Sequence, residues 1–221
     1  MSRGALIVVE GIDKSGKSTL ASSLVDRLQA TNCPAMLVCF PDRATPIGRL
    51  ITGYLTRTFE LTDQGLHLLM STNRWEKVKH IKHFLDQGVT IVCDRYCYSG
   101  VAYSLAKEDP HMGMTWCKTP DSGLPQPDLV LFLDLDPEEA FKRSSFGDEI
   151  YEESEFQKKV REKYALLREE DANSEKERTW TVLDASQCQE ELVQEAADWA
   201  GKCDTSQPLG RMWIMKEDES V

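Results

Sequence analysis

The chain has 221 residues, of which 37 are acidic and 26 basic, so its formal net charge is -11 at pH 7. A field of this sign repels polyanions and excludes a general nucleic-acid binder, although a local cluster of cations remains compatible with small phosphorylated ligands. The length suits one well-cored α/β domain, predicted over residues 1–213, with a C-terminal tail at 214–221.

Cysteine usage and hydropathy indicate the compartment. The seven cysteines are scattered without a Cys-x-x-Cys or any other metal-ligand spacing, which predicts a reducing compartment: the cytoplasm, with the nucleus as a further location. His80 and His83 have helical spacing, but no carboxylate or cysteine set accompanies them, so a solvated helix face is favoured over zinc. No signal peptide is expected, and no apolar run is long enough to span a membrane.

The first predicted elements are a strand at 5–10 and a helix at 17–30. Between them stands Gly11-Ile12-Asp13-Lys14-Ser15-Gly16-Lys17-Ser18. The spacing Gly-x-x-x-x-Gly-Lys-Ser lets several backbone N–H groups converge on a phosphate at the positive end of the following helix. Lys17 can then reach the β and γ phosphates, and the Ser18 hydroxyl can bind Mg²⁺. The alternative is a glycine-rich turn with a solvated lysine.

A second strand is predicted at 35–40, ending at Pro41. Thr45-Pro46 has the form of a helix start and precedes a helix at 47–55. The longest helical pattern opens at Thr62-Asp63 and continues to Gly88. The apolar run 89–93 then predicts a buried strand. It delivers Asp94-Arg95-Tyr96 at its carboxyl end, where ligands bind in open α/β sheets.

The second half of the chain continues the alternation of strands and helices. Residues 107–127 are rich in Pro and Gly and predict a long loop with a short helix. The charge-dense stretch 141–155 predicts a short mobile lid, and no helix or strand is expected after Asp204. The remaining predicted elements are strands at 128–133 and 179–183 and helices from Pro137, at 155–170 and at 190–201. This order predicts an α/β fold, a mainly parallel five-stranded sheet between two helical layers.

Several chemistries share the phosphate loop, but a GTP switch would need an Asn-Lys-x-Asp base reader, which the chain lacks. Around Asp94-Arg95-Tyr96 the sequence resembles thymidylate kinases of the eukaryotic and poxviral kind. The resemblance covers nearly the whole chain, and its motifs stand in order: Glu10-Gly11, Gly16-Lys17-Ser18-Thr19, Phe40-Pro41 with Arg43, Asn73-Arg74-Trp75-Glu76, Asp94-Arg95-Tyr96, Ser99-Gly100-Val101-Ala102, Gly123-Leu124-Pro125, Pro127-Asp128-Leu129-Val130.

The resemblance implies a three-layer P-loop kinase that moves the γ-phosphoryl group of ATP onto dTMP, with Mg²⁺ as cofactor and a homodimer as the assembly. The helix at 62–87 is one candidate dimer surface. An acceptor phosphate with a second pKa of about 6 is already a nucleophile at neutral pH, so no general base is needed. Placement of cations is needed instead, because catalysis of phosphoryl transfer is mainly positioning and charge stabilisation.

The resemblance also implies roles for single residues. The residue matching Arg95 bridges the acceptor and transferring phosphates, and those matching Arg43 and Arg74 grip the acceptor phosphate and base. A surface ion pair is the alternative for each of the three arginines, and it is weakest for Arg95, which follows a buried strand. Asp13 is implied to accept from the sugar 3′-hydroxyl, and Tyr103 to crowd the sugar 2′ position.

The complete predicted site has four groups. The catalytic residues are Lys14, Lys17, Asp94, Arg95 and Arg143, and the metal ligands are Ser18 directly and Asp94 through water. The ATP site comprises Gly11, Lys14, Ser15, Gly16, Lys17, Ser18, Thr19, Arg143, Asp184 and Ser186. The acceptor site comprises Asp13, Phe40, Pro41, Arg43, Met70, Arg74, Arg95, Gly100, Tyr103, Tyr151 and Gln157, with the Phe40-Pro41 peptide implied to be cis.

Three positions depart from the family pattern. Met70 stands where the family usually has a phenylalanine that stacks on thymine. A thioether can still cover a base, so acceptor specificity that extends to dUMP is left open. Lys14 replaces an arginine of the phosphate loop. It keeps the positive charge but lacks the planar, forked guanidinium group. Ile150 replaces an arginine of the lid, so the lid offers fewer cations, and Lys142 or Arg143 supplies more of the positive charge.

Two rival functions remain to be distinguished. A deoxynucleoside kinase would need a carboxylate to deprotonate a sugar hydroxyl and would not call for both Arg43 and Arg74. A catalytically inactive nucleotide-binding regulator would be marked by loss of Lys17, Asp94 or Arg95, and all three are present.

Overall fold

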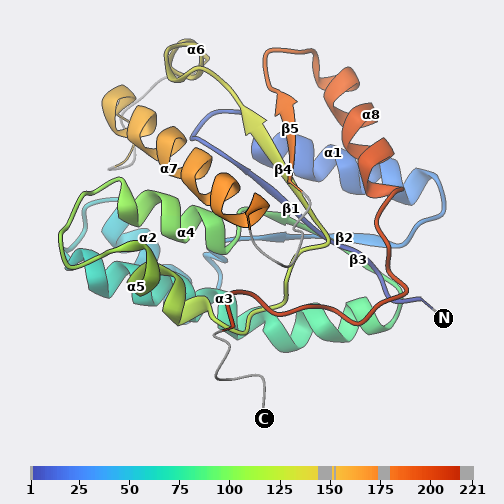
Figure 1. Cartoon of the computed structure of the whole chain (residues 1–221), viewed down its shortest axis with the longest axis horizontal. Coiled ribbons are helices and arrows are strands. Elements are labelled where there is room, and N and C mark those ends of the chain that lie inside the picture. The colour runs from blue at the N-terminus through green and yellow to red at the C-terminus, as the bar shows by residue number, and fades with distance from the viewer. Residues whose placement is uncertain (1, 144–150, 152, 174–179, 215–221) are drawn as a thin grey trace.

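The computed structural model describes residues 2–143, 151, 153–173 and 180–214. Its strands alternate with helices from the N-terminus onward (Figure 1). In chain order the elements are β1 (Leu6–Gly11), α1 (Lys17–Ala30), β2 (Ala35–Cys39), α2 (Pro46–Leu55), α3 (Asp63–Asp86), β3 (Thr90–Asp94), α4 (Cys97–Leu105), α5 (Met114–Lys118), the 3₁₀ turn η1 (Thr119–Asp121), β4 (Leu129–Asp134), α6 (Pro137–Lys142), α7 (Ser154–Ala172), β5 (Trp180–Asp184) and α8 (Gln189–Ala200).

The five strands form one sheet in the order β2-β3-β1-β4-β5, and every pairing between them is parallel. β1 therefore lies in the centre, with Val9 opposite Asp94 of β3 and Gly11 opposite Leu133 of β4. Because parallel strands end at the same edge, this register brings the loop after β1 and the residues after β3 together. The predicted α/β fold with a parallel five-stranded sheet is confirmed.

Helices cover both faces of the sheet and make the outer two of three layers. α1 and α8 pack together on one side, while α3, α4 and α7 pack together on the other (Figure 1). The longest of them, α3, has 24 residues and carries charged side chains along its length. None of the described helices combines the length and apolar character needed to cross a bilayer.

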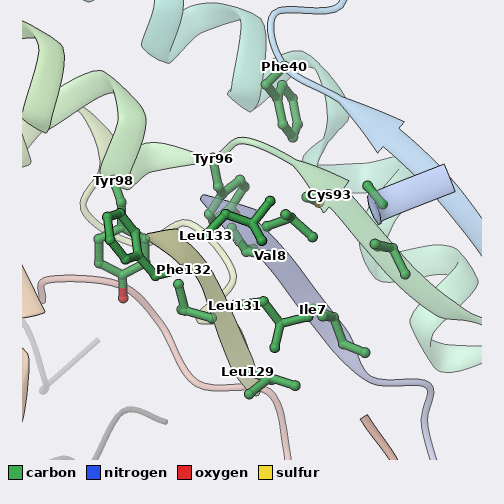
Figure 2. Packing of buried hydrophobic residues seen from close by; sticks show 14 of the residues in the cluster. Ile7, Val8, Phe40, Cys93, Tyr96, Tyr98, Leu129, Leu131, Phe132 and Leu133 are labelled. Carbon is green, nitrogen blue, oxygen red and sulfur yellow. The ribbon is translucent and has the colours of Figure 1, made fainter. Parts of the chain in front are cut away.

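The core lies between the sheet and these helices. Every residue of β1 and β3 is buried, which explains why both strands read as continuous apolar runs rather than alternating ones. Figure 2 shows Ile7 and Val8 of β1 close to Leu131 and Leu133 of β4, with Tyr96 beyond the strand ends. Removing such side chains from water supplies the main stabilisation of the sheet.

One helix of the structure was not predicted. α4 follows Tyr96 directly and has no side-chain cap of its own at its first residue. Its free N–H groups bind Glu10 of β1 instead, since Glu10 Oε1 accepts from the backbone N of Tyr96 at 2.9 Å and of Ser99 at 3.2 Å. A cap supplied from 86 residues away in the chain leaves no local sequence signal.

The chain after Asp204 contains no helix, as expected, but it is not a loose tail up to residue 214. The backbone of Met212 exchanges hydrogen bonds with Gly123 and Leu124, both at 2.8 Å, and the Met212 side chain is fully buried. The Phe40-Pro41 peptide is cis, as expected. Residues 144–150 and 152, which make up most of the predicted lid and include Ile150, lie outside the described residues, as do 215–221 of the predicted tail.

Candidate active site

A cavity of about 660 Å³ opens at the carboxyl edge of the sheet, around the loop after β1 and the residues after β3. Most of the predicted site residues line it: Asp13, Lys14, Gly16, Lys17, Ser18, Thr19, Phe40, Pro41, Arg43, Met70, Arg74, Asp94, Arg95, Gly100, Tyr103, Arg143 and Tyr151. One cavity thus brings together residues that the sequence assigned to two different ligands.

The phosphate loop wraps around Lys17. Gly16, the residue before α1, has φ 97°, a left-handed conformation that glycine adopts without a steric cost. Lys17 is 4% exposed, and its ammonium group donates to the Ile12 carbonyl and lies 3.5 Å from Ser15 Oγ. The solvated lysine of the alternative interpretation is therefore wrong. Burial, together with repulsion from Arg95, lowers the pKa of Lys17 to about 7.

Ser18 and Asp94 meet where β1 and β3 end. Ser18 Oγ donates to Asp94 Oδ2 at 2.5 Å. The other carboxylate oxygen, Asp94 Oδ1, is buried and has no hydrogen-bond partner among the described residues. A buried carboxylate oxygen without a donor, beside a hydroxyl, is the oxygen-rich arrangement that Mg²⁺ prefers. The donor set therefore fits a bound Mg²⁺.

Arg95 and Asp13 form an ion pair across the cavity floor. Arg95 Nη2 donates to Asp13 Oδ1, and Arg95 Nη1 donates to Ser99 Oγ at 3.3 Å. Gln157 Nε2 donates to the second oxygen of Asp13 at 2.8 Å. Burial would raise the pKa of Asp13, but the charges of Arg95 and Lys17 outweigh it and lower the pKa. Asp13 is therefore an ionised acceptor next to the arginine.

Glu10 supports this arrangement from beneath and was not predicted as a site residue. Its carboxylate is fully buried and accepts from Ser99 Oγ at 2.5 Å and Tyr164 Oη at 2.8 Å, in addition to the two backbone N–H groups of the α4 start. Burial raises the pKa of Glu10. The available signal was a glutamate at the end of the apolar run 5–9, because a charge in a buried strand needs partners.

The loop that carries Arg43 is held by Asn73 of α3. Asn73 Oδ1 accepts from the backbone N of Asp42 at 2.7 Å, and its Nδ2 donates to Asp42 O and Thr45 Oγ1 at 3.2 and 3.0 Å. Both ends of the Asn73 amide are used, so the loop is fixed against α3. Arg43 of this loop lines the cavity.

Part of the cavity lining is apolar, with a few polar groups. Leu55, Leu66 and Met70 form this part, together with Tyr103 and Tyr151. The rings of these tyrosines meet edge to face at 5.9 Å, and the Tyr103 ring also lies 5.3 Å from the Arg95 guanidinium. Aliphatic and aromatic side chains of this kind are the usual lining of a site for a flat, largely apolar ligand.

Arg74 also lines the cavity, and it forms a nearly fully buried pair with Asp121. Sequence alone left open that Arg74 forms an ion pair at the surface. Arg74 does form an ion pair, but the pair is buried, so the surface location is wrong. Asp121 was not predicted, because it lies in a turn-rich stretch that carries no periodic signal.

Some predicted residues do not line the cavity: Gly11, Ser15, Gln157, Asp184 and Ser186. Gln157 stands behind Asp13 and binds it. Asp184 and Ser186 form a turn after β5, with Ser186 Oγ donating to Asp184 Oδ1 at 2.6 Å. Arg143 links this turn to the cavity, since its Nη2 donates to the carbonyl of Ala185 at 2.7 Å.

Lys142 and Arg143 were predicted to supply the positive charge that the lid lacks at Ile150. Within the described part of the chain, only one of these two side chains faces the cavity. Arg143 lines it, whereas Lys142 is 68% exposed and pairs with Glu139 at 2.7 Å. The described residues contain no group of three His, Cys, Asp or Glu side chains that could hold a metal ion. His80 and His83 instead pack against the ring of Phe84, at 4.7 and 5.3 Å between centroids.

Comparison with known proteins gives consistent results. The family model described as thymidylate kinase matches residues 9–196 of the chain. The thymidylate kinase of Homo sapiens is 45% identical over 215 residues, which cover 96% of this chain and 98% of that protein. The thymidylate kinase of Danio rerio is 42% identical, with the same coverage of both chains.

A solved structure extends the likeness to three dimensions. The thymidylate kinase of Candida albicans, whose structure is described as revealing the origin of broad substrate specificity, superposes with a TM-score of 0.84. It is 40% identical in sequence, and the match covers 96% of this chain and 99% of that one.

Proposed function

Because the chain belongs to the thymidylate kinase family, we propose that its cavity holds ATP and dTMP together for a single phosphoryl transfer. The protein is an enzyme that phosphorylates dTMP to dTDP with ATP as the donor. The observation that supports this use of the cavity is the register of β1 and β3, which sets a phosphate-binding loop beside Asp94 and Arg95.

The donor side is formed by the phosphate loop and the end of α6. Backbone N–H groups of the loop, Lys17 and Arg143 bind the phosphates and cover the nucleotide, and the turn at Asp184 and Ser186 borders the base. We assign to ATP the residues Gly11, Lys14, Ser15, Gly16, Lys17, Ser18, Thr19, Arg143, Asp184 and Ser186.

Ser18 and Asp94 would hold Mg²⁺ on this side. The unsatisfied Asp94 Oδ1 and the neighbouring hydroxyl supply oxygen ligands. When bound, the ion would neutralise charge on the phosphate oxygens of ATP.

The acceptor side is formed by residues from the loop after β2, α3, α4 and the start of α7. Arg43 binds the acceptor phosphate, Phe40 and Met70 enclose the base, and Asp13 accepts from the sugar hydroxyl while Tyr103 borders the sugar. We assign to dTMP the residues Asp13, Phe40, Pro41, Arg43, Met70, Arg74, Arg95, Gly100, Tyr103, Tyr151 and Gln157.

In the transfer, an oxygen of the acceptor phosphate attacks the γ-phosphorus of ATP without a base, the bond from the γ-phosphorus to the β,γ-bridging oxygen breaks, and ADP leaves. Arg95 stands between donor and acceptor sides and stabilises the charge on the transferring group, with Lys17 and Lys14 on the donor side. The Arg95–Asp13 pair of the cavity floor can be exchanged on binding. Phosphate oxygens then replace the carboxylate at Arg95, and a sugar hydroxyl donates to Asp13.

A direct assay tests the function. The purified protein is incubated with ATP and either dTMP or thymidine, and ADP release is followed. We expect turnover with dTMP. Turnover with thymidine alone would support a deoxynucleoside kinase, and binding of ATP and dTMP without turnover would support an inactive regulator.

The pKa of Lys17 predicts a pH dependence of ATP binding. The ammonium form binds phosphate, and the pKa of Lys17 in the free protein is about 7. Above that pH, binding must first take up a proton, so ATP affinity should fall as pH rises, by roughly fivefold from pH 7 to pH 8. Isothermal titration calorimetry at several pH values measures this. Lys17→Arg, which stays charged, should give a flat profile, and a flat wild-type profile would show that Lys17 is already protonated.

Met70 predicts the breadth of acceptor use. A flexible thioether covers a base less selectively than an aromatic ring does, so we expect the enzyme to phosphorylate dUMP as well as dTMP. Met70→Phe should raise the kcat/KM ratio of dTMP to dUMP by about threefold to tenfold, because burying one methyl group contributes about 0.8 kcal/mol. Steady-state kinetics with both acceptors checks this. An unchanged ratio would show that this side chain is not the discriminator.

We further propose that the protein forms a homodimer. We also propose that it is located in the cytoplasm and in the nucleus. Leu68 and Trp75 lie seven residues apart on α3 and are 46% and 40% exposed, and Leu50 of the neighbouring α2 is 46% exposed. Such apolar side chains on packed helices favour a subunit contact. All seven cysteines are free thiols, which suits a reducing compartment. Sedimentation equilibrium tests the assembly, and a single 25.1 kDa species at micromolar concentration would contradict it.

A further inference from the structure

The face of α7 that packs on α4 carries three buried polar side chains. Gln157, Tyr164 and Asp171 stand at seven-residue intervals, which is about two helical turns, and they are 3%, 1% and 2% exposed. Each of the three lies within hydrogen-bond distance of a residue of α4: Tyr103 at 3.4 Å, Ser99 at 2.8 Å and Tyr98 at 2.9 Å, in the same order. Because buried polar contacts of this kind are rigid, α7 fixes the helix that begins two residues after Arg95.

Three oxygen atoms meet at the start of α4. Ser99 Oγ donates to Glu10 Oε2 at 2.5 Å, Tyr164 Oη donates to the same oxygen at 2.8 Å, and the two hydroxyl oxygens lie 2.8 Å apart. Two hydroxyl groups have only two hydrogens to donate. The shortest contact takes the Ser99 hydrogen, and the Tyr164 hydrogen is shared by Glu10 Oε2 and Ser99 Oγ. Toward any further neighbour, the Ser99 oxygen can therefore only accept.

Arg95 is that further neighbour. Its Nη1 donates to Ser99 Oγ at 3.3 Å and to the carbonyl of Gly11 at 3.4 Å. A guanidinium group has donors and no acceptor, so it fits a hydroxyl group whose own hydrogen is directed elsewhere. The carboxylate and the phenol beside Ser99 thus make its hydroxyl an acceptor for Arg95.

The two ends of the Arg95 guanidinium group differ in what happens to them when substrates bind. Nη2 donates to Asp13, and in the proposed transfer phosphate oxygens replace this carboxylate. Nη1 donates to Ser99 and to the main chain, which belong to the protein before and after the exchange. The Ser99 hydroxyl therefore still holds Arg95 when the phosphates are in place.

We propose that Ser99 is a positioning residue for the phosphoryl transfer. Its hydroxyl holds Nη1 of Arg95 while Nη2 exchanges the Asp13 carboxylate for phosphate. Tyr164 lies outside the cavity lining and acts on the reaction through Ser99. This proposal rests on the proposed function and on the role of Arg95 in it. Support at Nη1 affects the rate because a small displacement of a group that contacts the reacting atoms is costly in catalysis.

A double-mutant cycle tests whether Ser99 acts through Arg95. Single-turnover rates with saturating ATP and dTMP are measured for wild type, Ser99→Ala, Arg95→Ala and the double variant. We expect Ser99→Ala to lower the rate about tenfold, the usual contribution of one hydrogen bond to a charged group. In the Arg95→Ala background it should change the rate by less than about twofold, because the group that Ser99 holds is already absent. Equal losses in both backgrounds would overturn the proposal.

Tyr164→Phe and Tyr98→Phe form a matched pair for a second test. Both tyrosines are fully buried, and their hydroxyl groups donate to carboxylates at 2.8 and 2.9 Å. Each variant loses one such hydrogen bond, so their melting temperatures should fall by similar amounts. Tyr164→Phe should lower the single-turnover rate about threefold, and Tyr98→Phe should leave it unchanged. This pair decides the proposal if Ser99→Ala does not fold, and equal rates in the two variants would overturn it.

The same measurements separate a failure of the proposal from a failure of the function. A wild-type protein without dTMP kinase activity would refute the function on which the proposal rests. An active wild-type protein whose Arg95→Ala variant keeps near-normal turnover would overturn the proposal and leave the function standing.

Discussion

Arg95→Ala should lower the turnover of dTMP by about a thousandfold, since a cation that stabilises charge on a transferring phosphoryl group is worth that much in catalysis. Arg95 reaches the cavity from the residue after β3 and contacts Asp13, Gly11 and Ser99. Single-turnover kinetics with saturating ATP and dTMP measures the loss at the chemical step. The fold should stay intact, as seen in the near-ultraviolet circular dichroism, because the guanidinium group belongs to the cavity floor rather than the core.

Two variants make this result specific to Arg95. Arg95→Lys keeps the charge without the two-pronged donor, so its turnover should lie between those of wild type and Arg95→Ala. Arg27→Ala removes an arginine that binds Gln194 on the surface at 2.6 Å and should leave turnover unchanged. If Arg95→Ala kept near-normal turnover, Arg95 would have no part in the transfer.

Glu10→Gln should lower the free energy of unfolding by about 3 kcal/mol, the usual loss when a buried charged network loses one member. The Glu10 carboxylate accepts from Tyr96, Ser99 and Tyr164, and the glutamine amide would set a donor against one of these donors. For a chain of this length the melting temperature should fall by roughly 6–12 °C. Turnover should also fall, because Glu10 fixes the start of α4, next to Arg95.

Glu139→Gln is the matched control for this change. Glu139 is 57% exposed and pairs with Lys142 on α6, so the same substitution there should shift stability by no more than about 0.5 kcal/mol. Differential scanning calorimetry of both variants makes the comparison. Equal, small shifts would show that the Glu10 network contributes little to stability.

Much of the donor side could be predicted from sequence because its signals are local. The phosphate loop is one continuous motif, and the end of the apolar run 89–93 marks the carboxyl end of a buried strand. Fixed spacing and the edge rule for parallel strands therefore suffice to place Lys17, Ser18 and Asp94 in one site. The α/β fold follows in the same way from alternating strand and helix patterns.

The partners of the residues that hold the site in place could not be predicted, although Glu10 itself stands out at the end of an apolar run. Glu10 caps a helix 86 residues away, and Asp121 binds an arginine 47 residues away. Both act through contacts that only the folded chain creates, and Asp121 lies in a stretch without periodicity. The acceptor residues were available only through the family resemblance, since Arg43, Met70 and Tyr103 have no spacing that relates them to one another.

Two of the cations in this site stand on left-handed backbone. Lys14 has φ 63° and Arg95 has φ 67°, a conformation that costs a residue with a side chain about 1 kcal/mol or more and glycine very little. If Lys14 and Arg95 act in the transfer as proposed, the enzyme carries a stability–activity trade-off at both positions. Selection for thermal tolerance alone would favour glycine at both positions and would remove both cationic side chains. Gains in robustness should be sought where the same conformation serves no ligand, as at Arg57 with φ 58°, which lies outside the cavity lining.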